Sequence, residues 1–229
     1  MLGTTNGKSF GYDANGNQTS SSDSGTLSFY GNNLPKYNSK DGSNSSHFQY
    51  GPDRQRWKNG YRAGGVDYET IYVDTLFERV YDNSGGGKTT WKNYIRAGGM
   101  LVAMRARDTA GGDNTTYLLS DHLGSVSNYT DTSGNSLVAT SYGAFGARRQ
   151  ADWDGAPSQP ELDAMNALTR RGFTEHEMLD SSSLVHMNGR AYNPLVGRFV
   201  GADPFTPCVL GTQRWNRYSY VGNRASRAP

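Results

Sequence analysis

One pattern occurs twice in the chain and constrains its fold more than any other feature. The letters WKN, two further residues and RAGG stand at 57–65 and again at 91–99. Self-similarity at a fixed spacing is typical of proteins built from short supersecondary units, because one such unit cannot bury an apolar face by itself. The repeat therefore predicts units that stack on their neighbours. The alternative is a chance match in a glycine-rich chain.

Turn signals divide residues 1–150 into short segments. Residues 12–17, Tyr-Asp-Ala-Asn-Gly-Asn, are typical of a strand end followed by an Asx turn with glycine in the left-handed conformation. Related sequences recur further along, at 50–53, 81–85 and 129–134. With 29 glycines and 15 tyrosines, the composition favours many short strands joined by tight turns, and an aromatic content of 12% argues against a disordered chain. We expect a hairpin around the turn at 131–135.

Residues 151–171 differ in character and predict the single helix of the chain. Ser158 and Glu161 fit a capping box, with Pro160 in the first turn. An apolar stripe at helical spacing follows at Leu162, Met165 and Leu168. We expect a helical insertion at 151–171 with one short helix near 159–171, which packs its stripe on the sheet. A partner-binding helix is the alternative.

Composition and charge exclude several classes of function. The formal net charge is +2, so no strong field of either sign points to nucleic acid or a lipid surface as a partner. The arginine pairs at 148–149 and 170–171 are expected to lie in solvent. Cys208 is the single cysteine, which excludes an internal disulfide and a cysteine metal site. The longest apolar stretch, 100–104, is far too short to span a bilayer, and the first residues lack the pattern of a signal peptide.

Side chains that commonly carry catalysis or bind metals are scattered. His176 and His186 have acidic neighbours, but their spacing matches no standard zinc motif. Ser125 lacks the second glycine of a nucleophile elbow, and neither a phosphate loop nor a dinucleotide fingerprint is present. We therefore expect structural or surface histidines, no metal site and no cofactor.

The stretch at 172–204 is dense in turn-forming residues. Asn-Pro and Asp-Pro pairs favour turns and disfavour helix at the residue before the proline, and the apolar residues between them come in pieces too short for a helix. The stretch therefore predicts a tightly turned β segment. Its structural turn residues are Gly189, Asn193, Pro194, Gly197 and Pro204. We expect the two glycines to need left-handed backbone angles.

The order of these motifs resembles the core signature of the Rhs/YD-repeat family, and residues 117–125 are similar to a stock element just upstream of that core. The resemblance implies a mainly β fold, in which YD-repeat β-hairpins form a sheet that is part of a curved or spiralling shell. It divides the chain into a YD-repeat region at 1–150, the helical insertion, a core segment at 172–223 and a divergent tail at 224–229.

The resemblance also implies a function. Shells of this family enclose or present a toxic C-terminal domain, so we expect a structural terminal piece of such a shell, without catalysis of its own. The implied partners are upstream YD repeats and a C-terminal toxin or cargo, from a longer chain or a neighbouring gene, together with spike proteins of a secretion system. The implied location is secreted or at the cell surface, by a route that this chain does not encode.

Many members of the family carry an aspartic-protease-type centre that cuts its own chain, in which two close carboxylates share a proton. By that resemblance Arg190 matches the family's arginine and Asp203 its aspartate. Ala191 and Asn193 stand where self-cleaving members have acids, and an amide cannot exchange protons at neutral pH. The centre therefore looks incomplete. Two alternatives stay open: a self-processing peptidase with another carboxylate, and a carbohydrate- or surface-binding module that uses exposed tyrosines.

Overall fold

The computed structural model describes residues 2–5, 7–204 and 215–223. Within these residues fourteen strands form one antiparallel sheet, hereafter the wall, in which each strand pairs with its neighbours in the chain. The strands are β1 (Leu2–Thr5), β2 (Lys8–Tyr12), β3 (Gln18–Ser21), β4 (Gly25–Phe29), β5 (Pro35–Asp41), β6 (Asn44–Tyr50), β7 (Arg56–Ala63), β8 (Val66–Val73), β9 (Phe77–Asp82), β10 (Lys88–Ala97), β11 (Met100–Asp108), β12 (Asp113–Ser120), β13 (Val126–Thr130) and β14 (Ser136–Ala139). The predicted tail at 224–229 and Cys208 lie outside the described residues.

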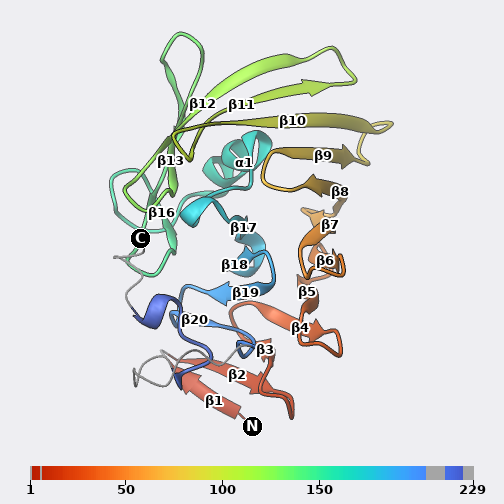
Figure 1. Cartoon of the computed structure of the whole chain (residues 1–229), viewed down its shortest axis with the longest axis vertical. Coiled ribbons are helices and arrows are strands. Elements are labelled where there is room, and N and C mark those ends of the chain that lie inside the picture. The colour runs from red at the N-terminus through yellow and green to blue at the C-terminus, as the bar shows by residue number, and fades with distance from the viewer. Residues whose placement is uncertain (1, 6, 205–214, 224–229) are drawn as a thin grey trace.

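The wall curves around the C-terminal part of the chain (Figure 1). Strands β4–β9 run up one side of the molecule, β10–β12 cross the top, and β13 descends on the other side. On the concave side lie α1 (Gln159–Leu168), the 3₁₀ turns η1 (Phe173–Glu175) and η2 (Asp180–Ser182), and a four-stranded antiparallel sheet of β17 (Glu177–Leu179), β18 (Leu184–Met187), β19 (Arg190–Asn193) and β20 (Arg198–Phe199). Strands β15 (Ser141–Tyr142) and β16 (Arg148–Arg149) pair separately, and η4 (Val221–Asn223) follows later.

Residues 168–200 run inside the curve and form the inner segment. The ends of the wall are β1 and β14, and among the described residues neither pairs with a strand on its outer side, so the sheet is open. The predicted fold class, a mainly β curved sheet with one short helix, is confirmed.

The predicted hairpin near the end of the wall shows how the turns are made. The Asp131 carboxylate accepts hydrogen bonds from the backbone N–H groups of Ser133 (2.8 Å) and Asn135 (2.9 Å). Gly134 lies between them with a φ of +84°, which side chains with a Cβ adopt only at a cost. This hairpin, between β13 and β14, is confirmed, and its second strand ends at Ala139.

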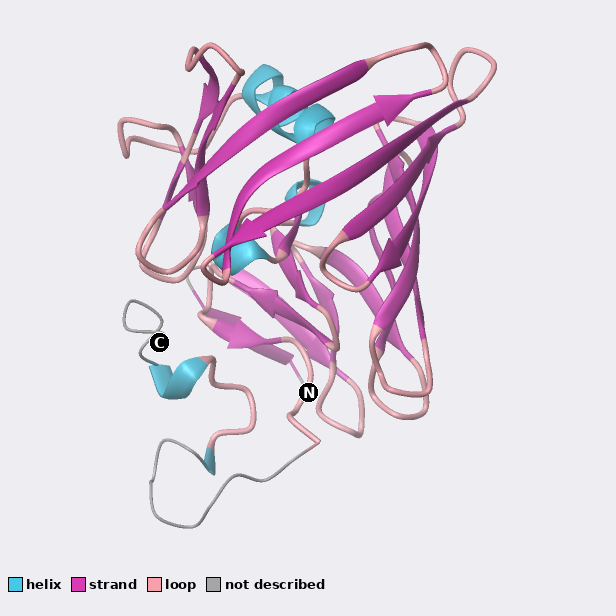
Figure 2. Ribbon diagram, turned by 45° about the horizontal axis from the view of Figure 1, so that its top comes forward, coloured by secondary structure: helices cyan, strands magenta, loops and turns pink. Residues whose placement is uncertain are grey.

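The helix begins as predicted but ends earlier. The backbone N–H of Ser158 donates to Glu161 at 2.7 Å, which is half of the predicted capping box. The helix stops at Leu168 and not near 171, because Thr169 is extended (φ −155°, ψ 151°) and the two arginines after it turn towards carboxylates outside the helix, Glu177 of β17 and Glu78 of the wall. Met165 is fully buried against β10–β13, so the stripe packs on the sheet as expected (Figure 2).

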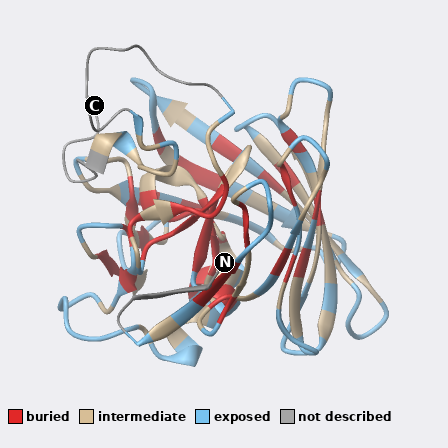
Figure 3. Cartoon of the chain, turned by 90° about the horizontal axis from the view of Figure 1, so that it is seen from below, coloured by how far each residue is buried: buried red, intermediate tan, exposed pale blue. Residues whose placement is uncertain are grey.

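Apolar clusters fill the remaining space between wall and inner segment, and buried residues gather there in Figure 3. Leu27 and Phe48 of the wall pack against four inner residues, Leu179, Leu184, Ala191 and Val200. A second cluster surrounds Tyr192 and Phe173. Because the inner sheet buries one of its faces against the wall, the two parts share one hydrophobic core.

The sequence repeat lies on β7 and β10, but it is not a repeat of packing. Strands β7 and β10 are three antiparallel pairings apart and run in opposite directions, so the two Gly-Gly turns that follow them lie at opposite ends of the strands. Asn59 is buried while its counterpart Asn93 is exposed, and Lys92 is buried while Lys58 is partly exposed. Side chains alternate along a strand, so a difference of one residue in phase turns opposite sides of the two copies inward.

Candidate functional site

The structure brings the two predicted catalytic residues together. Arg190 opens β19, Asp203 follows β20, and Nη1 of the arginine lies 2.9 Å from Oδ2 of the aspartate. The guanidinium also stacks on the Phe199 ring at 3.6 Å. Burial lowers the pKa of Arg190, and the Asp203 carboxylate opposes that effect. A catalytic role for the pair remains a proposal.

The two positions where acids were missing have structural roles. Ala191 is buried in the apolar cluster with Phe48 and Leu184, so an ionised side chain there would lose its hydration. Asn193 accepts a hydrogen bond from the backbone N–H of Leu195 at 2.9 Å and closes the turn between β19 and β20.

The other predicted turn residues behave differently from one another. Gly197 has a φ of +63°, and an added Cβ would lie 3.0 Å from the Phe145 ring. Gly189 does not have a positive φ, and its nearest neighbours would be 3.9 Å away, so the left-handed prediction is wrong there. Asn188 takes the left-handed conformation instead, with a φ of +55°. Pro194 lies buried in the turn, and Pro204 is exposed beyond β20.

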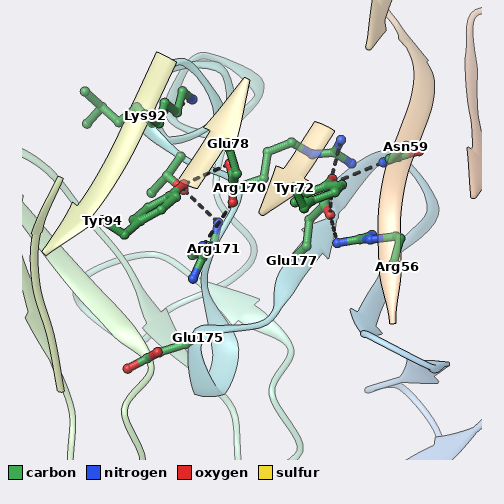
Figure 4. Close-up of polar contacts among 12 residues, drawn as sticks. Arg56, Asn59, Tyr72, Glu78, Lys92, Tyr94, Arg170, Arg171, Glu175 and Glu177 are labelled. Carbon is green, nitrogen blue, oxygen red and sulfur yellow. Dashed lines mark hydrogen bonds and ion pairs between the residues drawn. The ribbon is translucent and has the colours of Figure 1, made fainter. Parts of the chain in front are cut away.

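A larger polar cluster, which the sequence did not reveal, joins the wall to the inner segment around Glu177 (Figure 4). Glu177 opens β17 and its side chain is only 6% exposed. Its carboxylate forms ion pairs with Arg56 of β7 and, at 2.8 Å, with Arg170. Tyr72 donates its hydroxyl at 2.8 Å, and Asn59 donates its side-chain amide at 3.3 Å. One carboxylate of the inner segment thus holds two strands of the wall and the end of the helical region.

The electrostatics of Glu177 follow from these contacts. Burial by itself raises the pKa of this carboxyl, but the charges of Arg170 and Arg56 and the hydrogen bonds of Tyr72 and Arg56 outweigh it and lower the pKa to about 2. A general acid or base works best with a pKa near the working pH. Glu177 therefore stays ionised at neutral pH and is surrounded by hydrogen-bond donors. Its role is structural, because it holds the inner segment to the wall.

A second polar cluster lies one strand further along, around Glu78 of β9. Arg171 donates Nε to Glu78 at 3.1 Å, and Tyr94 donates its hydroxyl to the same carboxylate at 2.9 Å. The Tyr94 hydroxyl also lies 2.7 Å from that of Thr169, and the Arg171 guanidinium stacks 3.8 Å above the Tyr94 ring. Lys92 donates to the last carbonyl of α1 at 2.6 Å. Because Lys92 is buried, its pKa is lowered.

Further polar contacts continue this wall–segment interface in both directions. They join Arg96 to Glu175 (2.6 Å), Tyr50 to His186 (2.8 Å) and Asn38 to Ser182. Arg148 of β16, outside the wall, pairs with Asp180 of the inner segment at 2.8 Å. The expectation that both arginine pairs lie in solvent is wrong for three of the four residues, and only Arg149 is exposed. The partners are far apart in sequence, 93 residues in the case of Arg171 and Glu78, so no local pattern could reveal them.

One sequence feature is consistent with this interface: Glu177 stands directly before the apolar residues Met178 and Leu179. In the structure all three side chains of this short strand are buried. A buried carboxylate needs a buried cation as its partner. Among the described residues no three histidine, cysteine or acidic side chains are placed to hold a metal ion. The same part of the chain contains no helix long and apolar enough to cross a membrane.

Comparisons with known proteins find likeness in structure. No family model matches the chain, and no curated protein matches it. A crystal structure of a TcdB2–TccC3 complex superposes with a TM-score of 0.75 at 17% identity over 95% of this chain, and the same complex with Cdc42 gives 0.73 at 16% over 93%. A Tc holotoxin pore from Photorhabdus luminescens, with a substitution in TccC3, gives 0.74 at 17% over 95%.

These likenesses define a class of fold. This chain spans 10 to 11% of the length of the matched chains. At 16–17% identity the likeness is one of fold: a mainly β chain with an open antiparallel sheet, as in the Tc toxin complexes.

Proposed function

We propose that this chain is a structural piece of the wall of a hollow β shell of the Rhs/YD-repeat type, without catalysis of its own. The observation that carries the proposal is the open curved wall with an inner segment fastened to its concave face by buried ion pairs. A sheet that ends in unpaired strands is suited to continuation by further strands. A terminal position in the shell, as the core motifs imply, is part of the proposal.

The matched structures support a toxin-related role. They are TcdB2–TccC3 complexes and a Tc holotoxin pore. By analogy, the partners of this chain are further shell strands, from a longer chain or a neighbouring gene, and an enclosed or presented C-terminal toxin or cargo. Spike proteins of a secretion system are a further proposed partner. The proposed location is secreted or at the cell surface.

The test is to express the chain together with the coding sequence that flanks it in its genome, with an affinity tag, and to image the purified product by electron cryomicroscopy. We expect a hollow particle in which density continues across β1 or β14 as paired strands. A solitary particle the size of this 25.0 kDa chain, with both outer strands facing solvent, would contradict the proposal.

A second candidate function is self-processing, which the close approach of Arg190 and Asp203 favours. Asp203 would act as the base towards water, and another carboxyl would have to hold a proton. The test is mass spectrometry after long incubation between pH 4 and 8, with Asp203→Asn as the matched variant. We expect the intact mass in both; a fragment formed by the parent and not by the variant would establish self-processing.

A further inference from the structure

One contact of the wall–segment interface depends on a histidine at its centre. His186 on β18 is 1% exposed, and its Nε2 lies 2.8 Å from the Tyr50 hydroxyl on β6. The imidazole also packs against the Phe48 ring in a tilted arrangement, with centroids 4.4 Å apart. A neutral ring suits the contact at Nε2, because the tyrosine hydroxyl and this nitrogen share a single proton between them, while the buried Nδ1 has no hydrogen-bond partner. A second proton on the ring would have to be buried as a charge.

The charges that face His186 are mainly positive. Arg56 approaches from β7 and Arg170 from the start of the inner segment, and His176 lies nearby. Glu177 stands opposite His186 in the β17–β18 register, but its carboxylate is already engaged by the two arginines. A proton on His186 would therefore add a third buried cation to a cluster that holds one anion.

His176 is the second histidine of the interface. It follows η1, and the charged groups that face it are Arg56 of the wall, the neighbouring Glu175, and Arg171. Glu175 is itself paired with Arg96 at 2.6 Å. The two remaining histidines, His47 and His122, are exposed and belong to no such cluster.

We propose that His186 and His176 form an acid-sensitive latch, which holds the inner segment against the wall at neutral pH and loosens it at mildly acidic pH. Protonation of either ring places a new positive charge beside Arg56 and so opposes the contacts that fasten the segment. The latch goes beyond the shell function proposed above and does not depend on it.

The direction of the effect follows from the titration of both rings. Burial, and then the nearby Arg56, lower the pKa of His176 to about 4, and burial followed by Arg56 and His176 lowers the pKa of His186 well below 6.5. Released histidines titrate near 6.5. The latch is therefore fully closed above pH 6.5 and loses strength as pH falls below that value, until the bound rings are themselves protonated.

Each histidine can change the opening equilibrium by at most tenfold per pH unit, so the two together can change it by at most about a hundredfold per pH unit. The Glu177 carboxyl does not contribute in this range, because its pKa is about 2 in the folded chain and 4.5 is its ordinary value. Between pH 6.5 and 4.5 the response belongs to the histidines.

The test is hydrogen–deuterium exchange of the whole chain from pH 7.5 to 4.5, corrected for the intrinsic pH dependence of exchange. We expect protection of residues 169–200 to fall at least tenfold between pH 6.5 and 4.5, while β11 and β12 keep theirs. His176→Gln together with His186→Gln should remove this response. His47→Gln together with His122→Gln, the matched control, should leave it unchanged.

A second measurement on the unchanged protein covers the case in which the first double variant does not fold. Deuterium exchange at the imidazole C2 carbon, followed by mass spectrometry, reports the titration of each histidine separately. We expect the midpoints of His176 and His186 to lie well below 6.5. A midpoint near 6.5 for both, unchanged protection down to pH 4.5, or a histidine-free interface that still opens in acid would each overturn the latch.

Discussion

Replacing Glu177 by glutamine tests whether the buried ion pairs fasten the inner segment. Glutamine keeps the shape of the side chain and removes its charge, so Arg56 and Arg170 would remain buried without a counter-charge. Breaking a buried pair by removal of one partner costs about 3–5 kcal/mol, because the remaining charge is uncompensated. We expect Glu177→Gln to lower the free energy of unfolding by that amount.

The titration of Glu177 gives an independent figure. Its pKa is about 2, against an ordinary value of 4.5. At about 1.4 kcal/mol per unit of pKa, the folded chain favours the ionised carboxylate by about 3 kcal/mol. Because the pKa is lowered, this contribution is fully present above pH 4.5 and is lost as pH falls from 4.5 through about 2. The effect of Glu177→Gln should therefore be the same at pH 7 and at pH 5.

Glu69 offers a matched control on the outer face of the wall. Its carboxylate also contacts two cations, Lys58 at 2.6 Å and Arg79 at 3.1 Å, but its side chain is 33% exposed. Exposed pairs contribute about 0–1 kcal/mol, since water screens them. Urea unfolding, followed by tryptophan fluorescence and circular dichroism, should show a midpoint about 1 M lower for Glu177→Gln and nearly unchanged for Glu69→Gln.

The comparison is decisive because both variants remove one carboxylate from two cations. If the two midpoints fall by the same amount, burial does not distinguish the clusters and the fastening argument fails. If Glu177→Gln raises the midpoint, the cost of burying three charged groups exceeds their attraction, and the inner segment is held by its apolar contacts alone.

Three further predictions concern packing, the core turn and the open edges. Met165→Ala should cost about 2–5 kcal/mol in urea unfolding, because a fully buried side chain between helix and wall is removed. Gly197→Val should cost about 1–3 kcal/mol in thermal melts, since φ is +63° and Phe145 blocks the new Cβ, while Gly189→Val should cost less. Light scattering at micromolar concentration should show dimers or larger assemblies through the outer strands, with a net charge of only +2 to oppose them; a constant monomer mass on tenfold dilution would refute this.

Local chemistry explains which parts of the fold the sequence could predict. The Asx turn at Asp131, the left-handed Gly197 and the start of α1 each depend on residues that lie within a few positions of one another. The end of α1 does not. Thr169 leaves the helix because Arg170 pairs with Glu177 of β17 and the residue after it pairs with Glu78 of the wall, and no helical pattern contains that information.

The candidate site was predictable only in the part that a family pattern could supply. Arg190 and Asp203 were expected together and lie together. The clusters around Glu177 and Glu78 depend on strands β7–β10, whose residues are 75 (Tyr94 to Thr169) to 121 (Arg56 to Glu177) positions away from their partners. The two copies of the repeat differ by one residue in which side chains face inward, so Lys92 is buried while Lys58 is partly exposed. Because the amino acids are the same in both copies, the sequence could not predict this difference.

The concave face of the wall carries buried polar side chains on β8–β10 among its apolar ones, and these bear on how the inner segment is recognised. Thr70, Glu78 and Lys92 of β8–β10 face inward and are buried. Only a segment that places a guanidinium opposite Glu78 and a free helix carbonyl opposite Lys92 satisfies both groups. A slip by one residue would leave charges buried without partners, at a cost of several kcal/mol. The interface therefore selects one register of the inner segment, and the same dependence on charge is what a proton on His186 would disturb.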